Sequence, residues 1–156
     1  MKRKLTLCLI FLCGFFVVYG QGKVYSSKEA EAQGYPYQRL DAMYKSALHA
    51  NVVLAVFQTP KEQEDYQKAY LKFMADLNAF LKSHNFSWGK QTSCFNRIYF
   101  NSNGVVDYFL YTFSKDQITP EKEKEFDGLL KLFIQSHKFS MTASEKFAQC
   151  GPVRYN

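Results

Sequence analysis

The stretch CFNRIYFNSNGVVDYFLYTF, residues 94–113, consists of two aromatic-rich apolar runs joined by a short polar loop. The runs 94–100 and 105–113 have the β-branched and aromatic composition that is typical of strands. Asn103-Gly104 supplies the positive φ angles that a tight hairpin turn needs. The stretch therefore predicts an antiparallel hairpin. Its register stays open, because a two-residue loop and a longer bulged loop place different side chains on the core face.

A Thr-Pro pair opens each of the two segments that flank this hairpin. Thr59 and Thr119 can serve as helix N-caps, and each following proline takes the first helical position, where its missing N–H costs nothing. Apolar side chains then recur at helical spacing over residues 61–84 and again over 120–137. We therefore expect two main amphipathic helices.

The end of each helix carries the same pattern, because residues 77–87 and 130–140 both read Leu-x-x-Phe-(Leu/Ile)-x-Ser-His-x-Phe-Ser. The order strand, helix, strand thus occurs twice along the sequence, which predicts a split β-α-β arrangement. The expected fold class is α+β, with one antiparallel sheet and two main helices packed on one face. His84 and His137 hold equivalent places, where we expect them to bond the last helical carbonyls rather than a metal.

The remaining segments are assigned from composition and spacing. Residues 21–36 are polar and predict a flexible leader, and residues 37–156 a single domain. Apolar residues at helical spacing predict an N-terminal helix from Tyr37, namely Leu40, Met43, Tyr44, Ala47 and Leu48. Residues 52–57 read as a buried strand, with a buried helical segment as the alternative. A last extended stretch is expected from Phe139 to about Gln149.

Residues 1–20 have the three parts of a secretory signal peptide. Lys2, Arg3 and Lys4 precede an apolar run over residues 5–18, and small residues follow before Gln21. The run is shorter than the ~20 apolar residues of a spanning helix. Cleavage near Gly20 would leave no stable membrane span and a periplasmic or secreted domain. Retention of the segment as an anchor is the alternative.

Four cysteines are present, and two of them, Cys8 and Cys13, lie in the expected signal. Cys94 and Cys150 remain, and an even pair in an exported protein predicts a disulfide. Two free thiols are the alternative.

Charge and motifs exclude several function classes. Loss of residues 1–20 leaves 17 of the 20 basic residues against 14 acidic ones, a net charge of +3. This balance lacks the concentrated basic face that nucleic acid needs. No hydrolase, metalloprotease or phosphate-loop motif occurs, so the sequence predicts no enzyme, metal site or cofactor. Glu121, Glu123 and Glu125 alternate with lysines and read as a solvated helix face.

The chain is rich in aromatic residues, with 15 Phe, 11 Tyr and 1 Trp. Most of these side chains are expected to fill the core. Four of them are candidates for contact with a partner or a sugar: Trp88, Tyr99, Tyr108 and Tyr111. Thr142 and Ser144 join them, because they fall on the expected last strand and leave one side of it polar but uncharged.

Residues 94–155 resemble the C-terminal domain of TonB-type energy transducers. The resemblance is carried by Arg97-Ile98-Tyr99-Phe100 with Gly104-Val105-Val106, by the helix ending Phe133-Ile134, by Phe139-Ser140-Met141, and by Gly151-Pro152-Val153-Arg154-Tyr155. It implies an envelope interaction module that adds a strand to a partner.

The sequence thus favours a non-enzymatic protein-interaction module of the cell envelope. Its expected partner is an envelope protein, and homo-oligomers are also allowed. The alternative is a periplasmic or secreted protein that binds a small ligand or glycan through exposed aromatic side chains.

Overall fold

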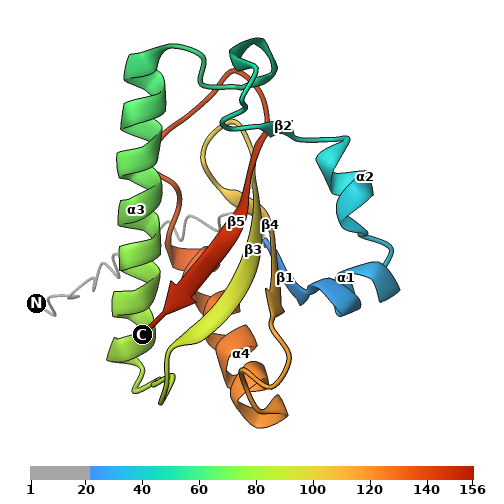
Figure 1. Cartoon of the computed structure of the whole chain (residues 1–156), viewed down its shortest axis with the longest axis vertical. Coiled ribbons are helices and arrows are strands. Elements are labelled where there is room, and N and C mark those ends of the chain that lie inside the picture. The colour runs from blue at the N-terminus through green and yellow to red at the C-terminus, as the bar shows by residue number, and fades with distance from the viewer. Residues whose placement is uncertain (1–21) are drawn as a thin grey trace, which may run out of the picture.

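The computed structural model describes residues 22–156 and shows a mixed α+β fold around a five-stranded sheet (Figure 1). The strands are β1 (Lys23–Ser26), β2 (Lys45–Ser46), β3 (Thr92–Phe100), β4 (Val106–Phe113) and β5 (Phe147–Tyr155), in the spatial order β1-β4-β3-β5-β2. The expected signal peptide lies outside the described residues. Within residues 22–156, no helix has the length and apolarity to cross a membrane.

The sheet is mixed, so the prediction of an antiparallel sheet is wrong. The three central strands are antiparallel, with β3 paired to β4 on one side and to β5 on the other. The two short N-terminal strands join the edges in parallel, β1 beside β4 and β2 beside β5. These edge strands have only four and two residues, too few for an alternating pattern to be recognised in the sequence.

The hairpin of β3 and β4 is present as predicted, and the structure fixes its register. Tyr99 lies opposite Tyr108, and the register shifts before Phe100 pairs with Val106. The loop between them is held by Asn101, whose Oδ1 accepts hydrogen bonds from the N–H groups of Asn103 and Val105 at 2.9 and 3.1 Å. Gly104 follows with a φ of 79°.

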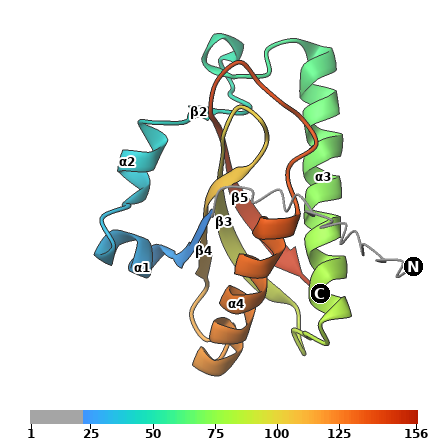
Figure 2. The ribbon, with the colours of Figure 1, turned by 180° about the vertical axis from the view of Figure 1, so that it is seen from behind.

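Two helices cover one face of the sheet, α3 (Pro60–Ser83) and α4 (Pro120–Ser136), close to the bounds that the sequence predicts. Thr59 forms a capping box with Glu62, and Thr119 accepts from the N–H of Lys122. The main core lies between these helices and the sheet, as Figure 2 shows from behind. Its largest fully buried side chains include Tyr66, Phe100, Phe109, Phe126 and Phe133.

The opposite face is covered by two short helices, α1 (Ser27–Ala32) and α2 (Tyr37–Asp41) (Figure 1). A second cluster is buried beneath them, formed by Ala30, Leu40, Tyr44, Tyr99 and Leu110. Residues 23–32, which fall within the expected flexible leader, form β1 and α1, and Val24 is 1% exposed. The helix expected from Tyr37 ends at Asp41, because the chain then pairs with β5 as β2.

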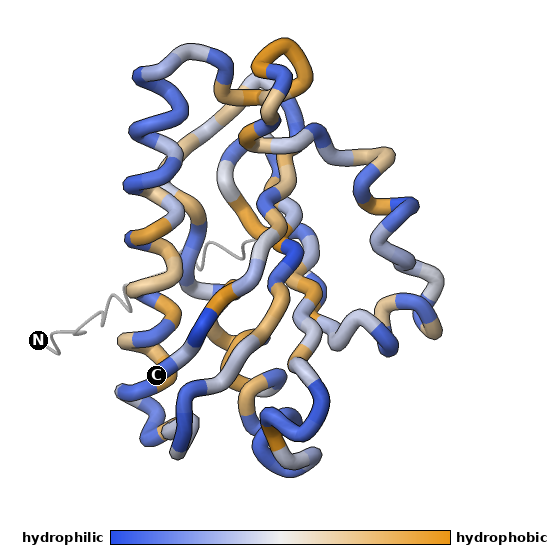
Figure 3. Tube along the Cα trace, viewed as in Figure 1, coloured by the Kyte–Doolittle hydropathy of each residue, from blue (hydrophilic) through white to orange (hydrophobic). Residues whose placement is uncertain are grey.

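Residues 52–57 form neither the expected strand nor a buried helical segment. Val52–Leu54 form the 3-10 turn η1, with exposed fractions of 47%, 69% and 52% for Val52, Val53 and Leu54. Figure 3 shows this hydrophobic tip at one end of the molecule. Local hydrogen bonds override the strand propensity here: Asn51 Oδ1 accepts from the N–H of Val53, and Gln58 donates to the carbonyl of Ala55.

The predicted disulfide is absent, because Cys94 and Cys150 lie on opposite faces of the sheet. Cys94 pairs with Val153, whereas Cys150 pairs with Arg97. The two cysteines are therefore an odd number of ladder positions apart, and side chains alternate between the faces of a strand. Cys94 is buried beneath the helices and Cys150 is exposed, so both are free thiols.

The last strand begins later than predicted. Phe139 and the residues that follow it form a connection that packs on the hairpin loop, where the N–H of Phe139 donates to the carbonyl of Gly104 at 2.8 Å and that of Ala143 to Ser102 at 2.9 Å. These bonds occupy main-chain groups that a strand would use. β5 therefore starts at Phe147 and runs through Pro152 to Tyr155.

Candidate functional site

The aromatic side chains that the sequence singled out do not form one exposed surface. Tyr99 and Tyr111 are 0% and 2% exposed and lie on opposite faces of the sheet, Tyr99 in the smaller cluster and Tyr111 in the main core. Trp88 is half-buried and stacks on Tyr155 at 4.5 Å between ring centroids. Tyr108 is half-buried against Tyr35 at 5.2 Å. Tyr99 and Tyr111 therefore offer no free ring face for stacking on a sugar.

Thr142 and Ser144 are exposed, but they lie in the connection before β5 and not on a strand edge. The hypothesis that they line the edge of the last strand is wrong. Their alternating polar pattern is typical of a strand, but the hydrogen bonds between the connection and the hairpin loop hold this segment outside the sheet.

A free strand edge does exist on β5. Its outer neighbour β2 pairs only with Phe147 and Ala148, and among residues 22–156 no strand covers that side from Gln149 to Tyr155. The N–H of Ala47 donates to the carbonyl of Ala148, so the main-chain groups of even-numbered residues point away from β3. Those of Cys150 and Arg154 therefore face the open edge.

Pro152 also faces the open edge, between Cys150 and Arg154. A proline there leaves the β3 ladder intact and removes one N–H from the free side, which is a common way to blunt an edge strand. The carbonyl oxygens of Cys150, Pro152 and Arg154 face the same side, and that of Cys150 accepts from the side-chain amide of Gln149 at 3.1 Å. The edge can therefore pair with a short segment but not with a continuous long strand.

An apolar groove of about 240 Å³ runs between this edge and α3. It is lined by Leu48, Tyr66, Gln67, Tyr70, Leu71 and Gln149. The hydroxyl of Tyr66 donates to Gln149 Oε1 at 3.0 Å and so ties the helix to the strand. Burial raises the pKa of Tyr70 to about 12 and that of Tyr66 further, so both rings are neutral lining groups. Leu71 is 69% exposed, a large apolar side chain open to solvent at the rim.

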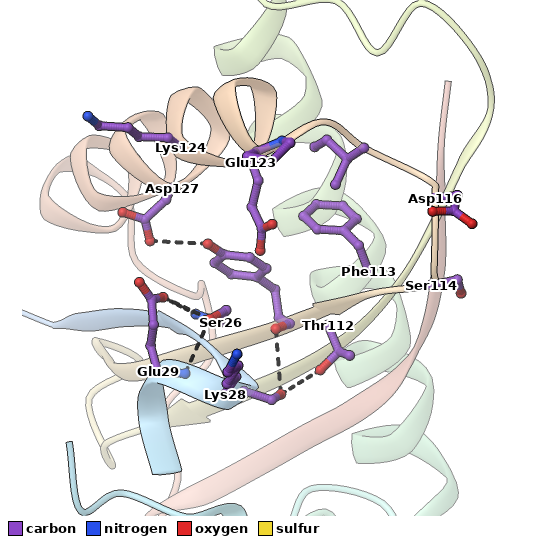
Figure 4. A pocket seen from close by; sticks show the side chains of 14 residues that line it. Ser26, Lys28, Glu29, Thr112, Phe113, Ser114, Asp116, Glu123, Lys124 and Asp127 are labelled. Carbon is purple, nitrogen blue, oxygen red and sulfur yellow. Dashed lines mark hydrogen bonds between the residues drawn. The ribbon is translucent and has the colours of Figure 1, made fainter. Parts of the chain in front are cut away.

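A second, more polar pocket of about 750 Å³ lies where the start of α4 faces α1 and the end of β4 (Figure 4). Ser26, Ser27, Lys28 and Glu29 line it from the β1–α1 junction. The strand supplies Tyr111, Thr112, Phe113 and Ser114. The loop and helix supply Asp116, Ile118, Pro120, Glu123, Lys124 and Asp127. Hydroxyl groups, two aromatic rings and four carboxylates thus share one cavity.

Three of these carboxylates differ in their partners. Glu29 accepts from the N–H and Oγ of Ser26 at 2.9 and 2.8 Å, and these bonds lower its pKa. Asp127 pairs with Lys131 and accepts from the hydroxyl of Tyr111 at 3.4 Å. Glu123 makes no hydrogen bond or ion pair with another described side chain. Its pKa is raised by burial first, and then by the charges of Glu29 and Asp127.

Neither pocket is a metal centre. Among the described residues, no three His, Cys, Asp or Glu side chains are arranged to hold a metal ion. His84 and His137 instead bond helix ends, as predicted: each Nδ1 donates to the carbonyl four residues earlier, that of Phe80 at 2.9 Å and that of Phe133 at 3.2 Å.

Sequence reasoning missed both cavities. The helical spacing over residues 61–84 includes Tyr66 and Tyr70 but not Leu71, and the position of all three beside a strand edge depends on the packing of α3. Glu123 was interpreted as a solvated helix residue because its neighbours are lysines, and no local signal places α1 opposite it. Comparisons with protein-family models, with curated proteins and with solved structures found no match to this chain.

Proposed function

We propose that this protein is an exported, non-enzymatic interaction module of the cell envelope that captures an extended segment of a protein partner. The segment would bind along the free edge of β5. The observation that carries the proposal is the stretch of β5 from Cys150 to Arg154 that no described strand pairs with, beside an apolar groove. Strand addition next to a side-chain groove is a common mode of peptide recognition, because the backbone gives affinity and the groove gives specificity.

The position of β2 supports this binding site. β2 pairs with the first two residues of β5 and then leaves the sheet. The strand position next to the rest of β5 is therefore vacant among the described residues. A partner segment that pairs with β5 at this position would direct every second side chain toward α3. The groove there is formed largely by Tyr66, Tyr70 and Leu71, and it therefore suits an apolar side chain.

The segment that fits is short. Pro152 offers no N–H, so a partner carbonyl opposite it would lose its hydrogen bond and must remain in water. Before that point the partner would run beside Gln149–Gly151, where only Cys150 turns its N–H and carbonyl toward the open side. Arg154 lies just beyond, exposed and without an ion pair among the described residues, and it favours an acidic group at that end of the partner.

Two expectations from the sequence belong to the same proposal. The signal-like N-terminus supports export to the periplasm or out of the cell, where the partner would be another envelope protein. The resemblance of residues 94–155 to the TonB C-terminal domain, with its split β-α-β arrangement, implies strand addition as the binding mode.

A site-specific crosslink tests the proposal. A photo-reactive phenylalanine analogue at Leu71, at the groove, is compared with the same analogue at Leu132, which is 50% exposed on α4 and outside the groove. The exported protein should crosslink to a discrete partner from position 71 only. Mass spectrometry should then place the linked residue in an extended segment of the partner.

A synthetic peptide of the linked segment provides the second measurement. Leu71→Glu should weaken its binding at least about tenfold, since a charge in an apolar groove is costly, whereas Leu132→Glu should leave it unchanged. Cys150→Pro removes an outward N–H without touching the β3 ladder and should also weaken binding. Equal crosslinking from both positions, or full binding by both edge and groove variants, would rule out capture at this edge.

A further inference from the structure

The cavity between α4 and α1 holds a combination of groups that the proposed strand addition does not use. Its lining has four carboxylates and two lysines, and Figure 4 shows Lys124 directed away from the cavity. The same view shows Glu123 and Asp127 extending from α4 and Glu29 facing Asp127 from α1. The cavity is therefore negative in balance, and it is too large for a bare metal ion.

Of the three carboxylates that meet between α1 and α4, Glu123 is the one without a partner among the described side chains. Glu29 is engaged by Ser26, and Asp127 by Lys131 and Tyr111. Glu123 is half-buried and has no such partner among residues 22–156, yet two like charges lie near it. A positive group placed here would pair with Glu123 and relieve the repulsion among the three carboxylates.

The other walls of the cavity match the remainder of such a ligand. The half-buried ring of Phe113 lines the cavity, and the buried ring of Tyr111 lies 5.5 Å from it between centroids. Aromatic faces attract organic cations as well as aliphatic chains. Ile118 and Pro120 add apolar surface, and Ser27 and Thr112, which hydrogen-bond to each other, add hydroxyls at the opposite rim.

From this arrangement we propose that the cavity is a binding site for an organic cation, a primary amine or guanidinium on an aliphatic stem. Glu123 holds the charged head, and the stem lies along Phe113, Ile118 and Pro120. The same chemistry occurs in free diamines and in the lysine or arginine side chains of a basic peptide. The site is separate from the β5 edge, because none of its lining residues belongs to the groove beside α3.

Calorimetric titration of the mature chain with agmatine tests this site. Saturable one-to-one binding is expected, and sorbitol, an uncharged polyol, should not bind. Glu123→Gln keeps the size of the side chain and should weaken agmatine binding at least about fivefold. Glu121→Gln is the matched control, since Glu121 lies in the same first turn but outside the cavity and should leave the affinity unchanged.

Three outcomes would overturn the proposal: no saturable binding of agmatine, binding of sorbitol with similar affinity, or equal weakening by both glutamine variants. A parallel titration with trilysine distinguishes the two sources. If trilysine binds more tightly than agmatine and Glu123→Gln abolishes that binding, the natural ligand is a basic segment of a protein. If agmatine binds more tightly and Glu123→Gln abolishes its binding, the natural ligand is a free amine. Binding at the β5 edge is measured with a different peptide, so either proposal can fail without the other.

Discussion

Cys94 and Cys150 stand on neighbouring strands with their side chains on opposite faces of the sheet, one paired with Val153 and the other with Arg97. No rotamer can bring the two sulfur atoms together, because the sheet itself lies between them. Residues 22–156 therefore carry one shielded and one accessible thiol.

The first prediction concerns these thiols. Burial raises the pKa of Cys94 to about 12, so at pH 8 its thiol is protonated, enclosed and unreactive. Of Cys94 and Cys150, iodoacetamide should label only Cys150 in native protein purified under reducing conditions, and both residues in urea. Peptide mass mapping checks this. Recovery of a Cys94–Cys150 linked peptide from non-reduced protein would contradict the register of β3 and β5.

The second prediction concerns the hairpin loop. Gly104 has a φ of 79°, and an added Cβ would lie 2.4 Å from the carbonyl oxygen of Phe139. Gly104→Ala should lower the free energy of unfolding by more than about 2 kcal/mol, through backbone strain and displacement of the connection before β5. Urea unfolding measures it.

Gly89→Ala is the matched control for this loop. Gly89 has a φ of 70°, but its Cβ would meet nothing within 4 Å, so the cost should be about 1 kcal/mol from the left-handed backbone alone. Equal losses at the two glycines would show that the contact with Phe139 does not matter.

The third prediction concerns the start of α3. Thr59 Oγ1 accepts from the N–H of Glu62 at 3.2 Å, and the Glu62 carboxylate accepts from the N–H of Thr59 at 2.9 Å. Thr59→Ala should destabilise the protein by about 1 kcal/mol, and Thr59→Ser should retain most of the stability. Thermal unfolding followed by circular dichroism compares the two. A serine variant as unstable as the alanine variant would argue against capping.

The fourth prediction concerns pH. The pKa of Glu123 is raised in the folded protein by burial and by Glu29 and Asp127. A carboxyl group with a raised folded pKa favours folding below its unfolded pKa, and this contribution is lost as pH rises through the folded value. At pH 7 the ionised Glu123 therefore opposes folding.

Glu123→Gln should accordingly give a small rise in Tm at pH 7 that shrinks toward pH 4, where the native side chain is also neutral. Glu121→Gln, at the exposed start of the same helix, should show no such rise. A Tm for Glu123→Gln that is lower than that of the native protein at pH 7 would mean that the ionised side chain already has a stabilising partner.

Local signals were sufficient for the elements whose hydrogen bonds close within a few residues. Thr59 and Thr119 cap their helices, His84 and His137 bond the preceding turns, and Asn101 closes the hairpin loop, all within four residues along the chain. Local chemistry also misled in one place: the apolar run at Val52–Leu54 forms an exposed turn, in which the side chains of Asn51 and Gln58 bond to neighbouring main-chain groups.

The sequence by itself determined the α+β class, the hairpin and both main helices, because these depend on side-chain period and capping, which are written in adjacent residues. Only the tertiary structure decided the parallel edge strands, the separation of Cys94 from Cys150, the groove beside Leu71 and the cavity around Glu123. Each of these joins residues far apart in the chain: β1 with β4, β3 with β5, α3 with β5, and α1 with α4. Register and helix placement are set by the packing of the whole core, and one residue of slip would exchange the faces on which these side chains lie.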